Sequence, residues 1–300
     1  MSRNQFSKYG RSAQPLPLGS GKSFYVVPSG SALITELQTM FPVDEGGVVK
    51  VYTDIASAIS AAVADRGDKI YLLPGTYTIS TALAMSKADV SLIGLGTPGS
   101  VILAGSAADV IDLTADGVEI ANVRIAIATT KIGIDMAGAD GCRIHDCTFT
   151  SAVGGAASHF IRMATTACNY NKIYDNQFIS NLVVTGGAIT QTSHITGLGI
   201  GNVIERNTFV AGRVSTANAG AVTAGIVFAA AADAGNVIRE NEFTEFNGAT
   251  FTTGVDYGTT ALGGSVLCTR NNFMLATAAN AVVPGSNAGE FANNIASGTV

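Results

Sequence analysis

Six short stretches of the chain carry apolar residues in the same pattern. In each stretch an isoleucine or cysteine is followed five positions later by a phenylalanine or isoleucine, and the last four stretches share an asparagine between them. The stretches begin 24 to 34 residues apart. Variable spacing with constant core positions is typical of stacked structural repeats. The six are "GVEIANVRI" (117–125), "GCRIHDCTF" (141–149), "YNKIYDNQF" (170–178), "GNVIERNTF" (201–209), "GNVIRENEF" (235–243) and "SVLCTRNNF" (265–273).

The repeated stretches are expected to be β-strands, because they are rich in β-branched residues and glycine. Their two apolar positions are five residues apart, so a straight strand would point them to opposite faces. If both are buried, the chain must bend between them, and asparagine suits that bend because it tolerates a left-handed backbone. A second strand-like segment precedes the units, as at 109–116 and 131–140.

Strand, turn, strand, bend and strand make one coil of a parallel β-helix. We therefore expect an all-β fold, a right-handed single-stranded parallel β-helix, over residues 51–300. Equivalent residues of successive coils then stack on one another. The expected stacks are Ile144, Ile173, Ile204 and Ile238; Phe149, Phe178, Phe209, Phe243 and Phe273; and Asn176, Asn207, Asn241 and Asn271.

The charged positions of the repeat also follow a column. Stacking places Glu205 against Arg239 and Arg206 against Glu240, at a strand spacing of roughly 4.8 Å. Opposite charges directly across two strands stabilise the pairing, whereas like charges destabilise it. The charges are therefore expected to fix the register of the coils. The full column reads Asp146, Asp175, Arg206, Glu240 and Arg270.

Residues 51–79 are expected to close one end of the β-helix. Thr53 or Asp54 can cap a short helix whose apolar face holds Ile55, Ile59, Ala62 and Val63. The following "GDKIYLLPGTYTI" supplies the first strands. This segment resembles the pectin-lyase-like superfamily, where a capping helix precedes a "GD-x-I-x-x-x-PG-x-Y" stretch, and the resemblance continues through the "N-x-F" units. It implies the fold, but this fold is shared by lyases, hydrolases and inert virion proteins.

Residues 1–50 are predicted to form an extended N-terminal arm that docks the protein on a partner. Residues 1–35 carry four basic residues and no acid. The segment "GKSFYVVPSGSALITELQTMFPVDEGGVVKVYTD" resembles the N-terminal region of tailed-phage β-helix proteins encoded among virion structural genes. We expect deletion of residues 1–30 to leave the β-helix folded. The expected docking residues are Arg3, Phe6, Lys8, Tyr9, Arg11, Lys22, Phe24 and Tyr25.

Composition narrows the class of protein further. The net charge of -5 does not favour nucleic-acid binding. A helix that spans a membrane needs a run of about 18 apolar residues, and the sequence contains none. A membrane is therefore not expected as a partner. The N-terminal stretch has no apolar core behind its basic residues and does not match a signal peptide. The four cysteines have no regular spacing, so reduced thiols are expected.

Three short motifs suggest chemistry but fit structural roles better. "GSGKS" (19–23) lacks the first glycine of a P-loop, and a strand-like "FYVV" follows where that motif needs a helix. "CRIHDC" (142–147) offers possible zinc ligands, but packed thiols and an exposed His145 fit the coil pattern better. His159 and His194 stand in no motif and are expected in loops or on the surface.

A polysaccharide-acting enzyme is the main alternative. Lyases of the resembled superfamily hold calcium on clustered acids and abstract a proton with a basic residue, while glycosidases need paired carboxylates. Asp112 and Asp135 are the best candidate pair, with Asp256 further along. Arg162 occupies the matching position in the next coil, which indicates an Asp–Arg register pair. Tryptophan is absent, and aromatic platforms for sugars are scarce. We therefore predict no catalytic residue, no cofactor and no metal.

The sequence thus predicts a non-enzymatic bacteriophage virion structural protein. The expected form is a capsid decoration (cement) protein that docks on the major capsid protein through its arm, assembles in the host cytoplasm and forms a homotrimer. The alternative is a tail spike or fibre protein with polysaccharide binding or with polysaccharide lyase or hydrolase activity.

Overall fold

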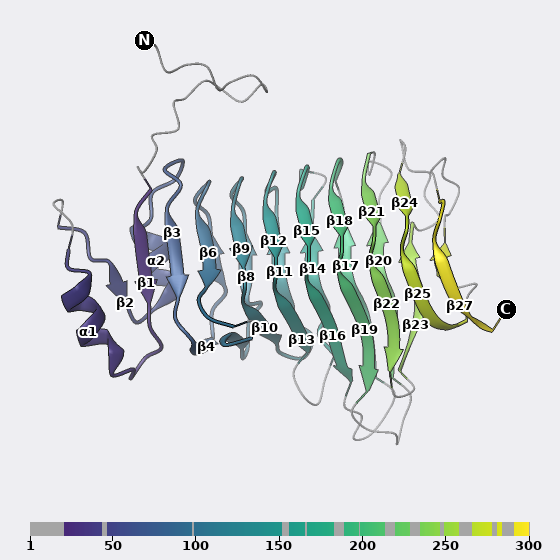
Figure 1. Cartoon of the computed structure of the whole chain (residues 1–300), viewed down its shortest axis with the longest axis horizontal. Helices are drawn as coiled ribbons and strands as arrows, with labels where there is room; N and C mark the ends of the chain where they lie inside the picture. Colours follow the sequence, from purple (N-terminus) through teal and green to yellow (C-terminus); the bar gives the residue numbers. More distant parts are fainter. Residues whose placement is uncertain are drawn as a thin grey trace, which may run out of the picture.

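The computed structural model describes most of the chain. The described residues are 21–43, 47–97, 99–151, 156–165, 167–182, 189–197, 199–213, 220–228, 235–246, 249–257, 266–277, 281–283 and 291–299. They form three parallel sheets, here called sheets A, B and C, and two short helices. The chain passes through A, B and C in turn, so that neighbouring strands in each sheet come from successive coils (Figure 1). This is the predicted right-handed parallel β-helix.

Sheet A has ten strands in the order β2-β1-β3-β6-β9-β12-β15-β18-β21-β24. Apart from its first strands it is built from the first half of the repeated unit. Its strands are β1 (Ser23–Val26), β2 (Val51–Tyr52), β3 (Lys69–Leu72), β6 (Ser91–Gly94), β9 (Glu119–Ala121), β12 (Arg143–His145), β15 (Lys172–Tyr174), β18 (Val203–Glu205), β21 (Val237–Arg239) and β24 (Leu267–Thr269).

Sheet B has nine strands in the order β27-β25-β22-β19-β16-β13-β10-β7-β4. It contains the phenylalanine position of the repeat. Its strands are β4 (Gly75–Ile79), β7 (Val101–Gly105), β10 (Arg124–Ile127), β13 (Thr148–Ser151), β16 (Gln177–Leu182), β19 (Thr208–Arg213), β22 (Glu242–Phe246), β25 (Asn272–Thr277) and β27 (Ile295–Thr299).

Sheet C has eight strands in the order β26-β23-β20-β17-β14-β11-β8-β5. It corresponds to the strand-like segments that precede each repeated unit. Its strands are β5 (Leu83–Met85), β8 (Ile111–Leu113), β11 (Ile132–Met136), β14 (His159–Met163), β17 (Ile189–Gly197), β20 (Gly220–Phe228), β23 (Ala249–Asp256) and β26 (Val282–Val283).

The interior is filled by ladders of identical side chains. In sheet A, Ile144, Ile173, Ile204 and Ile238 lie in register. In sheet B the rings of Phe149, Phe178, Phe209, Phe243 and Phe273 stack with centroid distances of 4.8, 4.9, 4.6 and 4.7 Å. All of these side chains are 0% exposed. Burial of so much apolar surface is the main stabilising contribution to the coil stack.

The bend between sheets A and B differs from the expected one. The left-handed backbone belongs to the charged residue that directly follows each of these sheet A strands: Asp146, Asp175, Arg206, Glu240 and Arg270 have φ between 54° and 59°. Each asparagine is instead buried, and its side chain bonds the backbone of the neighbouring coils. For example, Asn207 donates from Nδ2 to the carbonyl oxygen of Ile173 over 2.9 Å and accepts from the N–H of Asn176 over 3.0 Å. Asparagine is needed here because buried backbone groups must be hydrogen-bonded.

The charged column forms a chain of ion pairs, with one change from the expected partners. Arg239 meets Glu205 at 2.6 Å, as predicted. Arg206, however, bonds Asp175 and Glu205 at 2.9 and 2.7 Å, and Glu240 pairs with Arg270 at 2.8 Å. Arg206 reaches towards the preceding coil, so its expected pairing with Glu240 is wrong.

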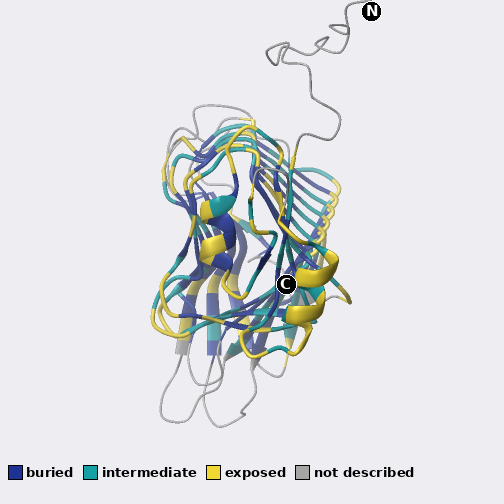
Figure 2. Ribbon diagram, turned by 90° about the vertical axis from the view of Figure 1, so that its left-hand side faces the viewer, coloured by how far each residue is buried: buried dark blue, intermediate teal, exposed yellow. Residues whose placement is uncertain are grey.

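Two helices lie at the N-terminal end of the β-helix (Figure 2). Helix α2 (Ile55–Ala61) is capped by Asp54, which accepts from the N–H groups of Ala56 and Ser57. Its residues Ile55, Ala58 and Ile59 are buried against the first coil. Val63, expected on the buried face, is 48% exposed because the helix ends before it. Helix α1 (Leu33–Met40) has no buried residue. Neither helix is long and apolar enough to span a membrane.

The expected boundary of the arm at residue 50 requires correction. Strand β1 lies between β2 and β3 inside sheet A. Phe24 is 0% exposed because it is part of the core, so it is not available for docking. Tyr25 packs its ring against Phe41 and Tyr71, with centroid distances of 4.4 and 5.7 Å.

The other expected docking residues divide into two groups. The main-chain N–H of Lys22 donates to the buried carboxylate of Asp68 over 2.7 Å, which ties the start of β1 to the turn after α2. The remaining five lie outside the described residues: Arg3, Phe6, Lys8, Tyr9 and Arg11.

Candidate active site

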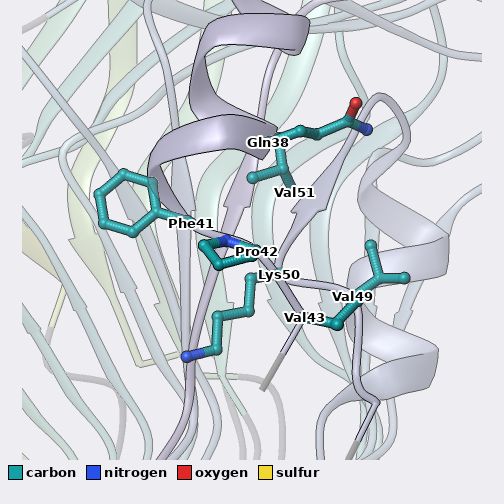
Figure 3. A pocket seen from close by; sticks show the side chains of 7 residues that line it. All are labelled: Gln38, Phe41, Pro42, Val43, Val49, Lys50 and Val51. Atoms are coloured by element: carbon teal, nitrogen blue, oxygen red, sulfur yellow. The ribbon is translucent and has the colours of Figure 1, made fainter. Parts of the chain in front are cut away.

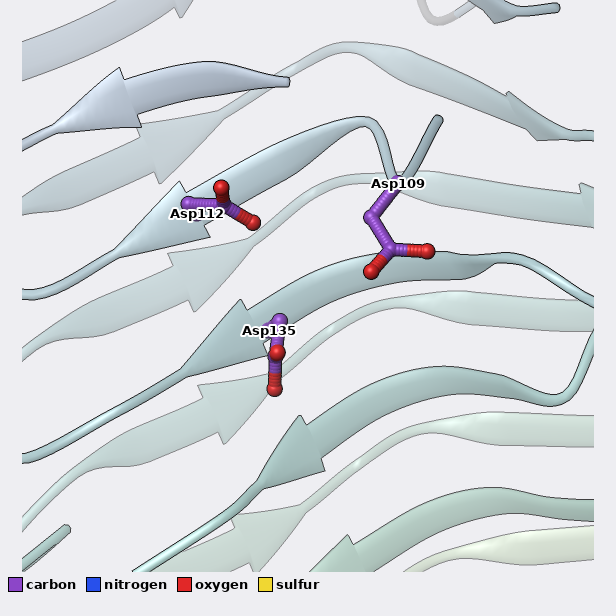
Figure 4. A group of neighbouring side chains, drawn as sticks. All are labelled: Asp109, Asp112 and Asp135. Carbon is purple, nitrogen blue, oxygen red and sulfur yellow. The ribbon is translucent and has the colours of Figure 1, made fainter. Parts of the chain in front are cut away.

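Three aspartates come together on the outer face of sheet C. Asp112 in β8 and Asp135 in β11 are in register on neighbouring strands. Asp109 stands just before β8, and Figure 4 shows its carboxylate reaching towards β11. One oxygen from each of Asp109, Asp112 and Asp135 lies within 4.8 Å of the others. We call these three residues the acidic cluster.

Strand alternation places two of these side chains outside. In β8, Ile111 and Leu113 point into the core, so Asp112 between them faces outwards. In β11, Ile134 and Met136 are buried on either side of Asp135 in the same way. Asp109 is held by a different contact, because its Oδ1 accepts the N–H of Ile132 over 2.8 Å.

Arg162 in β14 is the nearest basic group. It binds Asp135 through two hydrogen bonds, from Nε to Oδ1 over 2.8 Å and from Nη2 to Oδ2 over 2.5 Å. This is the Asp–Arg register pair predicted from the sequence. The hydrogen bonds that Arg162 donates to Asp135 raise the pKa of Arg162. The guanidinium is therefore fixed and charged beside the acidic cluster.

Asp112 has the least favourable position for a negative charge. Partial burial raises its pKa, and the nearby charges of Asp135 and Asp109 raise it further, while Arg162 opposes them. No hydrogen bond to the Asp112 carboxylate forms within the described part of the chain. A carboxylate in this state gains from an added positive charge, whether a proton or a metal ion.

His159 lies one strand further on, in β14, half-buried and outside any loop. Its Nδ1 is 2.8 Å from the hydroxyl oxygen of Ser193 in β17. Burial lowers the pKa of His159, and the charge of Arg162 lowers it further. The imidazole is therefore neutral at pH 7 and can accept a proton.

The donor set of the acidic cluster fits a hard divalent cation. All three side chains offer carboxylate oxygens, which are the ligands that Ca²⁺ and Mg²⁺ prefer. Cys and His, which soft metals favour, are absent from the cluster. Asp256, the third acid considered from the sequence, does not join it. It faces outwards in β23, four strands from Asp135 and thus roughly 19 Å away.

The "CRIHDC" segment does not form a metal site. Cys142 and Cys147 are buried, and burial raises the pKa of both thiols to about 12. His145 faces the other way, stacked on Tyr174 with ring centroids 4.7 Å apart. The thiols and the imidazole therefore cannot converge on one ion. All four cysteines of the chain are free and buried, as the sequence indicated.

His194, expected in a loop or on the surface, is 0% exposed in β17. It lies inside the β-helix among phenylalanine rings, where its Nε2 is 2.6 Å from the hydroxyl of Ser180. It has no route to a substrate and belongs to the core.

A small hollow lies at the N-terminal end of the β-helix, between α1 and the segment leading into β2 (Figure 3). Its walls are largely apolar, and within the described residues they offer no carboxylate or imidazole. It is therefore not a candidate for catalysis. The lining residues are Gln38, Phe41, Pro42, Val43, Val49, Lys50 and Val51.

Comparison with known proteins gives the fold. No protein-family model matches the chain, and no curated protein matches its sequence. A crystal structure of alginate lyase from Paenibacillus sp. str. FPU-7 matches with a TM-score of 0.52 and 15% identity, covering 80% of this chain and 91% of that one. This likeness shows that the two proteins share the parallel β-helix fold. The A-module of the Azotobacter vinelandii mannuronan C-5 epimerase AlgE6 matches with a TM-score of 0.32 and 13% identity, covering 83% and 95% of the two chains.

This result corrects the expectation that the protein is not an enzyme. A solved structure that shares the fold over most of both chains is an alginate lyase, an enzyme. This match gives no support to a phage decoration protein. The predicted capsid partner and virion location stay predictions.

Sequence reasoning found Asp112, Asp135 and Arg162 but missed Asp109 and misplaced His159. Asp109 lies outside the aligned strand positions and joins the cluster through the turn before β8. The recurrence of aspartate three residues before Asp112, in "DVIDL", is the sequence feature that could have indicated it.

Proposed function

We propose that this protein binds and cleaves an anionic, uronate-containing polysaccharide on the outer face of sheet C. The observation that carries the proposal is the acidic cluster, placed beside a fixed guanidinium and a neutral imidazole. The alginate lyase of the same fold supports the choice of a uronate polymer and of a lyase reaction.

An acidic cluster by itself repels an acidic sugar. A divalent cation on Asp109, Asp112 and Asp135 would supply the positive charge that binds the substrate carboxylate and makes the adjacent carbon–hydrogen bond more acidic. Arg162 adds a second, permanent positive charge at the edge of the same surface. Together these groups favour a carboxylated sugar over a neutral one.

His159 is the residue that can move a proton. Its Nδ1 is engaged by Ser193, and within the described residues its Nε2 has no hydrogen-bond partner, so Nε2 can take up the proton. In a lyase reaction the proton leaves the carbon next to the carboxylate, the bond to the leaving sugar oxygen breaks, and a carbon–carbon double bond forms. A neutral imidazole near pH 7 suits the first of these steps.

The test is incubation of the purified protein with alginate, polygalacturonate and a neutral glucan, each with Ca²⁺ and with a chelator. We expect ultraviolet-absorbing unsaturated products from a polyuronate only, with loss of activity in the chelator. Asp112→Asn and His159→Gln should each reduce the rate by about 100-fold or more. Asp256→Asn is the matched control, since it faces outwards on the same sheet but far from the cluster, and it should change little.

Three outcomes separate the alternatives. Reducing sugar without unsaturated product would mean a hydrolase and would overturn the lyase reaction. Retention of the polymer on the protein without cleavage would leave a binding protein and overturn catalysis. If a folded protein neither binds nor cleaves any polyuronate, the proposed function is wrong.

A further inference from the structure

The outer face of sheet B differs from those of the other two sheets. Two columns of side chains face outwards along it. The first runs in register from Thr76 to Ile295 and includes Arg124, Gln177 and Glu242. Apart from Arg124 and Glu242, the described residues of both columns are uncharged, mainly Thr, Ala, Ile and Val. Sheet A, by contrast, is edged by ion pairs, and sheet C carries the acidic cluster.

The two charges on this face have no partner among the described residues. They lie four strands apart, or roughly 19 Å, which is too far for an ion pair. Within the described part of the chain neither side chain forms a salt bridge, and the buried Nε of Arg124 has no hydrogen-bond partner. A buried donor without a partner is unfavourable, so an acceptor supplied from outside would stabilise the structure.

The positions of these charges are symmetric about one strand. Strand β16 is the middle of the nine, with four strands on each side. Arg124 lies in β10, two strands to one side of β16, and Glu242 lies in β22, two strands to the other side. Both occupy the same column, at the level of Gln177 in β16.

A two-fold axis that runs parallel to β16, between two facing copies of sheet B, would therefore bring opposite charges together. Rotation by 180° about this axis reverses the order of the strands and turns the second sheet to face the first. Each residue keeps its position along the strand direction. Arg124 of one copy then meets Glu242 of the second copy, and the reverse pair forms on the other side of the axis. An isologous contact of this kind uses the same patch on both subunits.

We propose that two copies of this chain pair through the outer faces of sheet B, with their long axes antiparallel and the two-fold axis along β16. Nine strands extend over roughly 38 Å, and five residues along each strand over roughly 16 Å. This face of about 600 Å² per copy reaches the lower end of the range for specific dimers. Its short side chains allow the two sheets to approach to the usual distance of about 10 Å.

This contact leaves sheet C uncovered, so it is independent of the proposed activity. It also differs from the homotrimer predicted from the sequence. The two Arg124–Glu242 pairs fix the alignment of the subunits, since sliding by one strand would separate both pairs.

The test uses sedimentation velocity on the full-length protein. The parent is expected at twice its chain mass of 30.5 kDa. Arg124→Glu places like charges opposite each other twice in the dimer, and so does Glu242→Arg. Each single variant is therefore expected to dissociate at concentrations at least 10-fold higher than the parent.

Mixing the two single variants provides the decisive measurement. In the mixed dimer every charge again meets its opposite, so equal amounts of the two variants should form a heterodimer. The double variant Arg124→Glu, Glu242→Arg should dimerise alone. Lys172→Glu, on the outer face of sheet A, is the control and should stay dimeric.

Circular dichroism of each variant shows whether it is folded. A monomeric or trimeric parent overturns the proposal. So do single variants that dimerise as strongly as the parent, and so does a folded mixture that stays monomeric.

Discussion

At the scale of single residues, the asparagines between sheets A and B show how a polar side chain becomes part of a core. Asn176, Asn207, Asn241 and Asn271 are each 1% exposed. Each donates to a carbonyl oxygen in the preceding coil and accepts a backbone N–H from it, so the row continues from coil to coil. Leucine or alanine at these positions would leave both backbone groups without a partner.

Replacing Asn207 by alanine should reduce the free energy of unfolding by roughly 2–4 kcal/mol, because at least two buried backbone groups lose their partners. Chemical denaturation of parent and variant measures the difference. Thr250→Ala, at an exposed position of sheet C, is the control and should change stability by about 0.5 kcal/mol or less. Equal losses of unfolding free energy in the two variants would show that the buried asparagines do not contribute this stabilisation.

His194 is a second residue whose role depends on burial. Its Nδ1 has no partner among the described residues, and its ring lies against Phe160 and Phe209. Burial lowers the pKa of His194 from 6.5 to about 3. The folded protein thus holds a neutral imidazole at pH values where the unfolded chain is already protonated.

This shift predicts an acid-sensitive stability. The contribution of the neutral His194 is complete above pH 6.5 and is lost as the pH falls towards 3. Between these pH values the free energy of unfolding falls by up to about 1.4 kcal/mol for each pH unit, because the unfolded state binds one more proton than the folded state. His194→Gln should therefore flatten the fall in stability between about pH 6 and about pH 4. Parallel curves for parent and variant, obtained by denaturant titration at each pH, would contradict this assignment.

At the scale of elements, β1 is the part of the N-terminal region that belongs to the β-helix. It fills the space between β2 and β3, and it contributes Phe24 to the core. The hydrogen bond from Lys22 to Asp68 joins it to the turn after α2. The sequence suggested an arm here because prolines and glycines surround a strand of only four residues.

Two deletions separate the arm from the β-helix. Removing residues 1–20 should leave the melting temperature nearly unchanged, since none of the contacts described above involves them. Removing residues 1–30 should lower it strongly, because sheet A loses a strand and the core loses Phe24 at a cost of roughly 3–5 kcal/mol for the side chain alone. This replaces the expectation that deletion of residues 1–30 would leave the β-helix folded. Equal melting temperatures for the two truncated proteins would show that β1 is dispensable.

At the scale of the whole molecule, the repeat in the sequence was sufficient to predict the three-sheet coil and its ladders. The ladders can be predicted from the sequence because identical residues recur at the positions where coils stack, as Phe149 and Phe178 do. The acidic cluster was only partly readable, since Asp109 reaches it through a turn that breaks the column. The burial of His194 could not be read, because a polar residue inside a coil has the same sequence pattern as one outside it.

The coils differ in length, yet the corner between sheets A and B is nearly constant. Ile144 and Phe149 are five residues apart, as are Ile238 and Phe243, while the extra residues fall elsewhere in the coil. Each coil therefore adds the same rise to the stack, about 4.8 Å, whatever its number of residues. Duplication or loss of one coil therefore changes the length of the β-helix by this fixed step, while its cross-section stays the same.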